Sequence, residues 1–199
     1  MTPPTPLIDD YLLGTHVYSV MVDEAEGAYL AIEHLSSFGH ERIALIRGDK
    51  SYTTNDYKER GYRQAFTDLS LQTDESLVIR TDAHEAGGYT AANALLDKPE
   101  PPTAIFTVND QLAIGAIRAV NERGLRIPQD ISIVGFSDLP ISSHLYPPLT
   151  SVNQHSEKIG AIAAATILKV IRGKDLDQKR VLLQPALSIR QSTGPVSRP

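Results

Sequence analysis

The sequence predicts an α/β fold, a doubly wound parallel sheet with helices on both faces. Short apolar runs rich in β-branched residues alternate with segments of helical period along most of the 199 residues. These alternating segments have the lengths of the strands and helices in βαβ units. The most apolar runs, at 43–46, 103–107 and 131–136, show no polar alternation, which indicates strands buried on both faces.

The first part of the chain holds three strand–helix pairs. Residues 16–22 predict a strand, and Asp23 predicts the N-cap of the next helix, with Glu26 three residues on as in a capping box. Apolar residues then recur at helical spacing up to Gly39, where a left-handed C-cap is expected. The elements predicted next are a strand at 43–46, a helix at 56–69, a strand at 77–79 and a helix at 85–96.

Two more strands flank one further helix. A strand is predicted at 103–107, and Asp110 is expected to cap the helix that runs to Arg123, which Gly124 ends. Contact with a ligand is the alternative role of Asp110, and the two roles are compatible. A second buried strand is predicted at 131–136.

The longest predicted helix covers 155–171 and is closed by Gly173. Its isoleucines recur about every four residues and form one apolar stripe, made of Ile159, Ile162, Ile167 and Ile171. Residues 1–22 are too few to supply a covering sheet, so we expect this stripe to be exposed or covered by another chain. Short strands at 181–183 and 186–189 complete the pattern.

The composition excludes several classes of protein. The chain has no cysteine, which rules out disulfides, a thiol nucleophile and cysteine-ligated metals. Its net charge of −5 argues against non-specific binding of nucleic acid. No apolar run approaches the roughly 18 residues of a membrane span, and residues 1–6 do not resemble a signal peptide. We therefore expect a cytoplasmic protein whose contacts with DNA, if any, lie outside this part.

Three near-matches to catalytic motifs are incomplete. Residues 48–51 resemble the end of a phosphate-binding loop but lack its earlier glycine. Residues 135–139 begin like a nucleophile elbow but lack its second glycine. The six histidines include no pair at the helical spacing of a zinc site. We expect no enzymatic activity, no metal and no other cofactor.

Polar segments follow the four central strands, at 47–54, 80–83, 108–110 and 137–138. Ligands of open α/β sheets bind beyond the carboxyl ends of the strands, so this lining favours a hydroxyl-rich small molecule. Asn109 is a better ligand candidate than Asp110, and Asp138 either ends a strand or meets the ligand. Lys58 and Arg60 lie near the predicted start of their helix, where cations are unfavourable, so an anionic or hydroxylated partner would explain them.

Seven segments occur together in an order that is typical of one family. They are GHERIALI at 39–46, PTAIF at 102–106, NDQLAIG at 109–115, GLRIP at 124–128, QDISIVGF at 129–136, PPLT at 147–150 and IRQS at 189–192. This set resembles the lactose-repressor-type (LacI/GalR) family of bacterial transcription regulators. The resemblance covers nearly everything from about residue 20 to residue 193.

The resemblance implies a two-lobed core similar to periplasmic sugar-binding proteins, with one complete lobe here and remnants of a second. Residues 1–22 would be a remnant of the N-terminal lobe, and 23–152 the C-terminal lobe of the effector-binding domain. Residues 153–184 would return to the N-terminal lobe, and 185–199 would form the last strand and tail. The family's helix-turn-helix and most of its first lobe have no counterpart in these residues, which implies an N-terminally truncated chain.

The resemblance also implies effector positions. It adds Thr54, which matches a ligand-bonding position, and Gln154, which matches a hinge-side position facing the cleft. Lys58 stands where arginine is usual and lacks its bidentate fork, and Ser137 stands where an aspartate usually grips the ligand. Ala83 replaces a frequent aromatic. The predicted effector-binding residues are Thr54, Lys58, Arg60, Asn109, Asp110, Ser137, Asp138 and Gln154.

The function implied is the effector-sensing and dimerising portion of a DNA-binding regulator, with a sugar or sugar derivative bound between two lobes. Its partners would be this effector, a second copy of the chain, and DNA through a helix-turn-helix outside these residues. The alternatives are a solute-binding protein of a sugar transporter and an α/β enzyme. The small residues of 111–120 and around Gly87 could pack against another subunit or internally.

Overall fold

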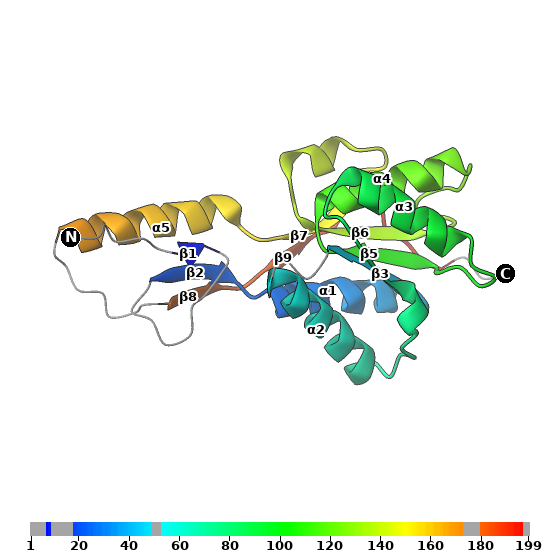
Figure 1. Cartoon of the computed structure of the whole chain (residues 1–199), viewed down its shortest axis with the longest axis horizontal. Helices are drawn as coiled ribbons and strands as arrows, with labels where there is room; N and C mark the ends of the chain where they lie inside the picture. The colour runs from blue at the N-terminus through cyan, green and yellow to red at the C-terminus, as the bar shows by residue number, and fades with distance from the viewer. Residues whose placement is uncertain (1–6, 9–17, 49–52, 173–179, 197–199) are drawn as a thin grey trace.

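The structure is a computed structural model and describes residues 7–8, 18–48, 53–172 and 180–196. It is elongated, with a larger helix-covered sheet at one end and a smaller sheet beside one long helix at the other (Figure 1). The chain passes between the two sheets three times, at residues 22–24, 153–156 and 183–186. We call these three crossings together the junction.

The larger sheet has six strands in the order β4-β3-β5-β6-β7-β9. Five are parallel, and β9 runs antiparallel to β7. Helices α1 and α2 lie on one face and α3 and α4 on the other, which confirms the predicted fold class (Figure 1). The bounds are α1 Glu24–Ser37, β3 Ile43–Gly48, α2 Thr53–Asp68, β4 Val78–Thr81, α3 Glu85–Leu96, β5 Ala104–Thr107, α4 Asp110–Glu122, β6 Ser132–Ser137, β7 Thr150–Asn153 and β9 Ala186–Ser188.

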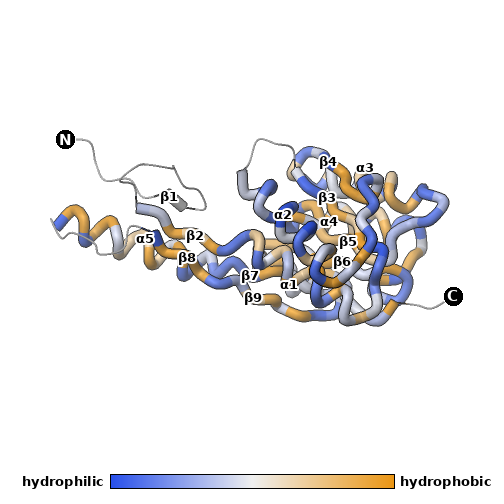
Figure 2. Tube along the Cα trace, turned by 90° about the horizontal axis from the view of Figure 1, so that it is seen from below, coloured by the Kyte–Doolittle hydropathy of each residue, from blue (hydrophilic) through white to orange (hydrophobic). Residues whose placement is uncertain are grey.

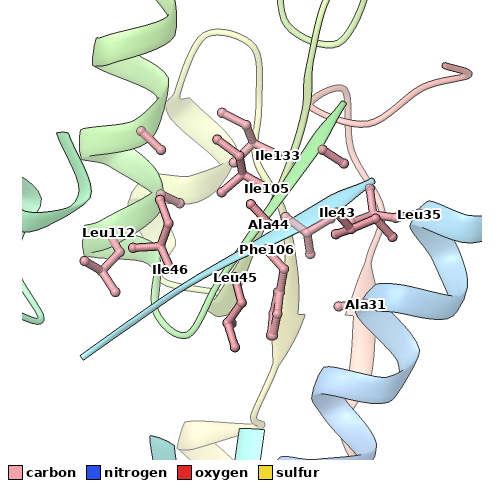
Figure 3. Packing of buried hydrophobic residues seen from close by; sticks show 14 of the residues in the cluster. Ala31, Leu35, Ile43, Ala44, Leu45, Ile46, Ile105, Phe106, Leu112 and Ile133 are labelled. Carbon is pink, nitrogen blue, oxygen red and sulfur yellow. The ribbon is translucent and has the colours of Figure 1, made fainter. Parts of the chain in front are cut away.

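The central strands of this sheet are buried on both faces, as their unbroken apolar sequences predict. Every residue of β3 and β5 is buried. Ala44, Ile105 and Ile133 are register neighbours across β3, β5 and β6, so they form one row of the core (Figure 3). Hydrophobic residues are concentrated along these strands (Figure 2).

The smaller sheet is parallel, in the order β1-β2-β8, with α5 packed against it. The bounds are β1 Leu7–Ile8, β2 Ser19–Val22, α5 Ser156–Ile171 and β8 Arg180–Leu183. Val20 and Val22 of β2 contact Ile159 and Ala163, the two buried residues of α5. The beginning of the predicted isoleucine stripe is therefore covered by this chain.

The far end of α5 carries the exposed apolar surface that the sequence predicts. Ile171 is largely exposed, as is its neighbour Leu168, while Ile162 and Ile167 are half-buried. Apolar residues recur along the whole helix (Figure 2). The expected closure at Gly173 lies outside the described residues.

Several predicted boundaries are confirmed and others are corrected. Helix α3 has its predicted bounds, and Asp23 caps α1 by accepting a hydrogen bond from the Glu26 amide. Helix α2 begins at Thr53, three residues before its predicted start, and Leu77 belongs to the 3-10 helix η1 (Glu75–Leu77). The pattern did not predict β7 or the 3-10 helix η2 (Pro140–His144).

Close packing between helix pairs explains the small residues of α3 and α4. A side chain on Gly88 would overlap the backbone of Leu112, and one on Gly115 would overlap the backbone of Glu85. Gly61 approaches the backbone of Ala25 in the same way, which brings α2 against α1. The small residues therefore serve internal packing, one of the two readings that the sequence left open.

A buried histidine fixes the C-terminal segment to the larger sheet. His40 is 1% exposed, and its ring nitrogens lie 2.9 Å from Thr103 Oγ1, 3.0 Å from Ser132 Oγ and 3.0 Å from the carbonyl oxygen of Gly194. Burial lowers the pKa of His40 below its ordinary value of 6.5, against an opposing effect of its bond to Gly194. The pKa of His34, which contacts Thr193, is also lowered, first by burial and then by His40.

We expect the chain to lose stability as the pH falls from about 6.5 through the lowered pKa values of these histidines. In that window the unfolded state binds more protons than the folded state, so acid favours unfolding. Urea unfolding between pH 7.5 and pH 5 measures the effect, and the His40→Gln variant should show a smaller slope. A stability that is flat over this window in the parent chain would contradict the assignment.

Candidate functional site

The carboxyl ends of the parallel strands face the junction, where two cavities lie. The larger, about 500 Å³, is bounded by the end of β6, the end of β7 and the start of α5. The smaller, about 200 Å³, lies between β2, β8, the start of α1 and the second turn of α2. The larger is lined by Ser137, Asp138, Leu139, Pro140, Asn153, His155, Ser156, Glu157 and Lys158. The smaller is lined by Met21, Val22, Asp23, Glu24, Ala25, Tyr57, Arg60 and Leu182.

Asn109, and not Asp110, caps the helix that follows β5. Asn109 is the N-cap of α4, and its Oδ1 accepts a hydrogen bond from the Leu112 amide at 2.8 Å. Its Nδ2 donates to the carbonyl oxygen of Ala83 at 3.0 Å, which links the ends of β5 and β4. The prediction that Asp110 caps this helix is wrong, because the helix begins at Asp110 itself.

Asp110 instead holds together the turn after β6. Its carboxylate is 0% exposed and accepts hydrogen bonds from Ser151 Oγ at 2.6 Å, Ser142 Oγ at 2.7 Å and the Leu139 amide at 2.7 Å. Burial raises the pKa of Asp110, while these bonds act in the opposite direction. Since no surface of this side chain reaches a cavity, its predicted contact with the effector is not supported.

Ser137 and Asp138 form a turn of unusual backbone conformation at the larger cavity. Both have positive φ, 112° and 52°, as does His155 across the cavity at 55°. Asp138 pairs with Arg190 at 2.7 Å and accepts hydrogen bonds from Asn153 and from Ser188. This carboxylate therefore ties β6 to β7 and β9, and Ser137 is the member of the turn that offers a hydroxyl to the cavity.

Lys58, which the sequence predicts to contact the effector, is almost fully buried. It sits in the second turn of α2, so the argument that placed it at the helix start is wrong. Its Nζ lies 3.1 Å from Glu24 Oε2, donates to the carbonyl oxygen of Val108 at 3.1 Å and lies 4.2 Å from the centroid of the Phe136 ring. Glu24, which lies in the first crossing, therefore neutralises Lys58, the cation that was expected to bind the ligand.

Arg60 and Thr54 occupy the outer part of α2. The Arg60 guanidinium is exposed and lies 4.9 Å from the centroid of the Tyr57 ring, and both residues line the smaller cavity. Like Lys58, Arg60 is past the first turn, so the predicted conflict with the helix dipole does not arise. Thr54 is half-buried in the first turn of α2 and lines neither cavity at the junction.

The second crossing contributes Gln154, which the sequence predicts, and Asn153, which it does not. Gln154 Nε2 donates to Glu24 Oε1 at 3.0 Å, so it joins the first and second crossings. Asn153 lines the larger cavity, and its Oδ1 accepts from the His155 amide at 2.6 Å. Glu24 and Asn153 have no signature in the sequence, because the side chains that they contact, Lys58 and Gln154 for Glu24 and Asp138 for Asn153, are distant in the chain.

Among the described residues, no three or more histidine, aspartate or glutamate side chains lie together in a way that could hold a metal ion. Within the same residues no helix is long and apolar enough to cross a bilayer. Most of the fragment that resembles a phosphate-binding loop, residues 49–51, lies outside the described residues.

Comparison with known proteins gives one consistent result. Residues 32–193 match the family model of the periplasmic binding protein-like domain. The chain is 40% identical over 178 residues to the HTH-type transcriptional regulator DegA of Bacillus subtilis, which covers 89% of this chain and 52% of that protein. The chain spans about half the length of the curated relatives it matches.

Solved structures agree. A regulatory protein of the LacI family from Chloroflexus aggregans superposes with a TM-score of 0.88 at 33% identity, covering 95% of this chain and 69% of that one. A LacI family transcriptional regulator from Enterococcus faecium, solved with bound ribose, superposes with a TM-score of 0.89 at 29% identity, covering 96% and 72%.

Proposed function

Since this chain belongs to the LacI family of transcriptional regulators and carries its periplasmic binding protein-like domain, we propose that it senses a small polar effector at the junction. We further propose the division into lobes implied by the resemblance: 23–152 as one lobe, 1–22 and 153–184 as parts of the other, and 185–199 as the last strand and tail. DNA would be bound in the cytoplasm by a part of the protein outside these 199 residues. The net charge of −5 is consistent with DNA contacts outside these residues, because an acidic surface does not neutralise phosphates.

The observation that carries the proposal is the convergence of the three crossings on the carboxyl edge of the larger sheet. Glu24 and Gln154 join the first two crossings, and the Asp23 amide donates to the carbonyl oxygen of Leu183 at 3.0 Å, which joins the first and third. A ligand seated there contacts both sheets at once. Because it meets groups whose spacing depends on how the sheets are arranged, it can favour one arrangement over another.

The chemistry around the cavities favours a sugar or sugar derivative. Ser137 and Asn153 offer a hydroxyl and an amide at the larger cavity, and Arg60 offers guanidinium donors at the smaller one. Hydroxyls and amides both donate and accept, as adjacent sugar hydroxyls require. The Enterococcus faecium relative was solved with ribose, which supports this class of ligand. The named relatives are regulators, which disfavours the transport and enzyme alternatives.

The test is a calorimetric titration of the chain with a panel of uncharged pentoses, hexoses and disaccharides. We expect one of them to bind saturably, and Ser137→Ala to weaken it by about 5- to 100-fold through loss of a polar contact. Ser143→Ala, on the exposed side of η2, is the control and should bind normally. Absence of binding across the panel, or equal affinity in Ser137→Ala, would count against the proposed site.

We also propose that the chain forms a homodimer through the loop after η2 and the end of β9. Tyr146 is 90% exposed, and Ile141 and Ile189 are also largely exposed. These three lie on connected segments, because the Leu149 amide donates to the carbonyl oxygen of Ser142 and the Gln191 amide to that of Pro148. Aromatic and aliphatic residues exposed to this degree are typical of interfaces.

Replacing Tyr146 by aspartate should therefore weaken dimerisation by at least about tenfold, because a charge would be buried in the contact. Sedimentation equilibrium measures the change. Leu168→Asp, on the exposed end of α5, serves as the comparison. If only Leu168→Asp dissociates the dimer, the interface lies on α5; a monomeric parent chain would overturn the proposal of a dimer.

A further inference from the structure

Lys58 is a buried cation that contacts the first crossing through Glu24, and the chain itself neutralises it. The residue is 6% exposed, between α2, the end of β5 and the Phe136 ring. Its ammonium pairs with the Glu24 carboxylate at 3.1 Å. An anionic ligand that approached Lys58 would therefore meet a site already occupied by a negative charge.

Glu24 is buried, and each of its carboxylate oxygens contacts a side chain of the junction. It is 5% exposed at the first position of α1, where the positive end of the helix dipole favours a carboxylate. Its two oxygens face Lys58 and Gln154, at 3.1 Å and 3.0 Å. It also lines the smaller cavity, so it stands between that space and Lys58.

The charges around the smaller cavity balance. Asp23, Glu24 and Arg60 line the cavity, and Lys58 lies behind Glu24 as its ion-pair partner, so two negative charges meet two positive ones. Removing one member of a buried ion pair leaves an uncompensated charge, which is costly in a site of low dielectric. A third anion would either displace Glu24 or add such a charge.

We propose that Glu24 is a specificity-determining residue of the effector site, which selects ligands uncharged at the atoms that approach the Glu24–Lys58 pair and rejects carboxylates and phosphates. This inference rests on the proposed function. It assigns to Glu24 the place that an anionic group of a ligand would otherwise take. Glutamine at position 24 would keep the bond from Gln154 in outline but free the charge of Lys58.

The test measures binding of sulfate, as a simple anion, by calorimetry and thermal unfolding. We expect Glu24→Gln to bind sulfate about 10- to 100-fold more tightly than the parent chain, as a charge-assisted hydrogen bond allows. The double variant Glu24→Gln with Lys58→Met should lose that gain. Glu26→Gln removes an exposed carboxylate from the same helical turn and should behave like the parent chain.

A second variant covers the case in which Glu24→Gln folds poorly. In Glu24→Ala, acetate should raise the unfolding temperature saturably, because it replaces the missing carboxylate beside Lys58. Acetate should not do so in the parent chain or in the variant that also carries Lys58→Met. Sulfate binding in the parent chain as tight as in Glu24→Gln, or no gain of anion binding in either variant, would overturn the inference.

These outcomes are independent of the sugar titration. If anion binding appears in Glu24→Gln but no uncharged sugar binds the parent chain, the proposed effector class is wrong and the role of Glu24 toward Lys58 stands. If sugars bind but the variants gain no affinity for anions, the effector site stands and the selective role of Glu24 is wrong.

Discussion

Replacing Asp110 by alanine is expected to lower the free energy of unfolding by about 3–5 kcal/mol. The substitution leaves three donors without their acceptor, namely the hydroxyls of Ser142 and Ser151 and the amide of Leu139. Each of them is at least half-buried, so water replaces the carboxylate poorly. The loss should also loosen the turn that presents Ser137 to the larger cavity.

Urea unfolding of the parent chain and the variant measures this effect. Asp97→Ala is the matched control, because Asp97 is an exposed aspartate that pairs with Arg123 at the surface. Exposed pairs of this kind contribute little, so the control should unfold close to the parent chain. If the two aspartate variants lose the same stability, the role assigned to Asp110 is wrong.

Replacing Gly115 by alanine should cost about 1–3 kcal/mol or more, because the added methyl group has no room. A Cβ there would lie 2.5 Å from the Tyr89 amide nitrogen and nearer still to the carbonyl oxygen of Glu85. The backbones of α3 and α4 would have to separate. That movement disturbs Asn109, which caps α4 beside the strand ends.

The control is the same substitution at Gly160 in α5, where no atom would lie within 4 Å of the new side chain. Alanine there should stabilise the chain by up to about 1 kcal/mol through its helix propensity. The two variants are therefore expected to change stability in opposite directions. A neutral Gly115→Ala would show that the helices can move apart at no cost.

The fold could be predicted because its signals are local. Apolar runs and helical spacing follow from the residues of each element, and Asp23, Gly39 and Gly124 mark helix ends by their own chemistry. Strand β7 was not predicted, because its sequence, TSVN, is mostly polar. Its polar residues are buried by partners far along the chain, such as Ser192 against the Thr150 amide and Asp110 against Ser151.

The site could be predicted only in part, because several of its residues are placed by partners that are distant in the sequence. Asn and Asp are equally good caps, so the pattern could not tell which of Asn109 and Asp110 caps the helix and which begins it. Asn109 is the cap, and Asp110 is buried against the turn after β6. The burial of Lys58 depends on Glu24 from another helix, a contact without any signature in either local sequence.

Amide chemical-shift mapping of the chain with the uncharged sugar that binds best locates the effector directly. We expect shifts at the junction, centred on Ser137, Asn153, Gln154, Glu24 and Arg60. The groove of about 730 Å³ around Arg42 and Leu71, at the opposite edge of the sheet from the junction, should not respond. Shifts confined to that groove, with none at the junction, would contradict the claim that the effector binds where the chain crosses between its two sheets.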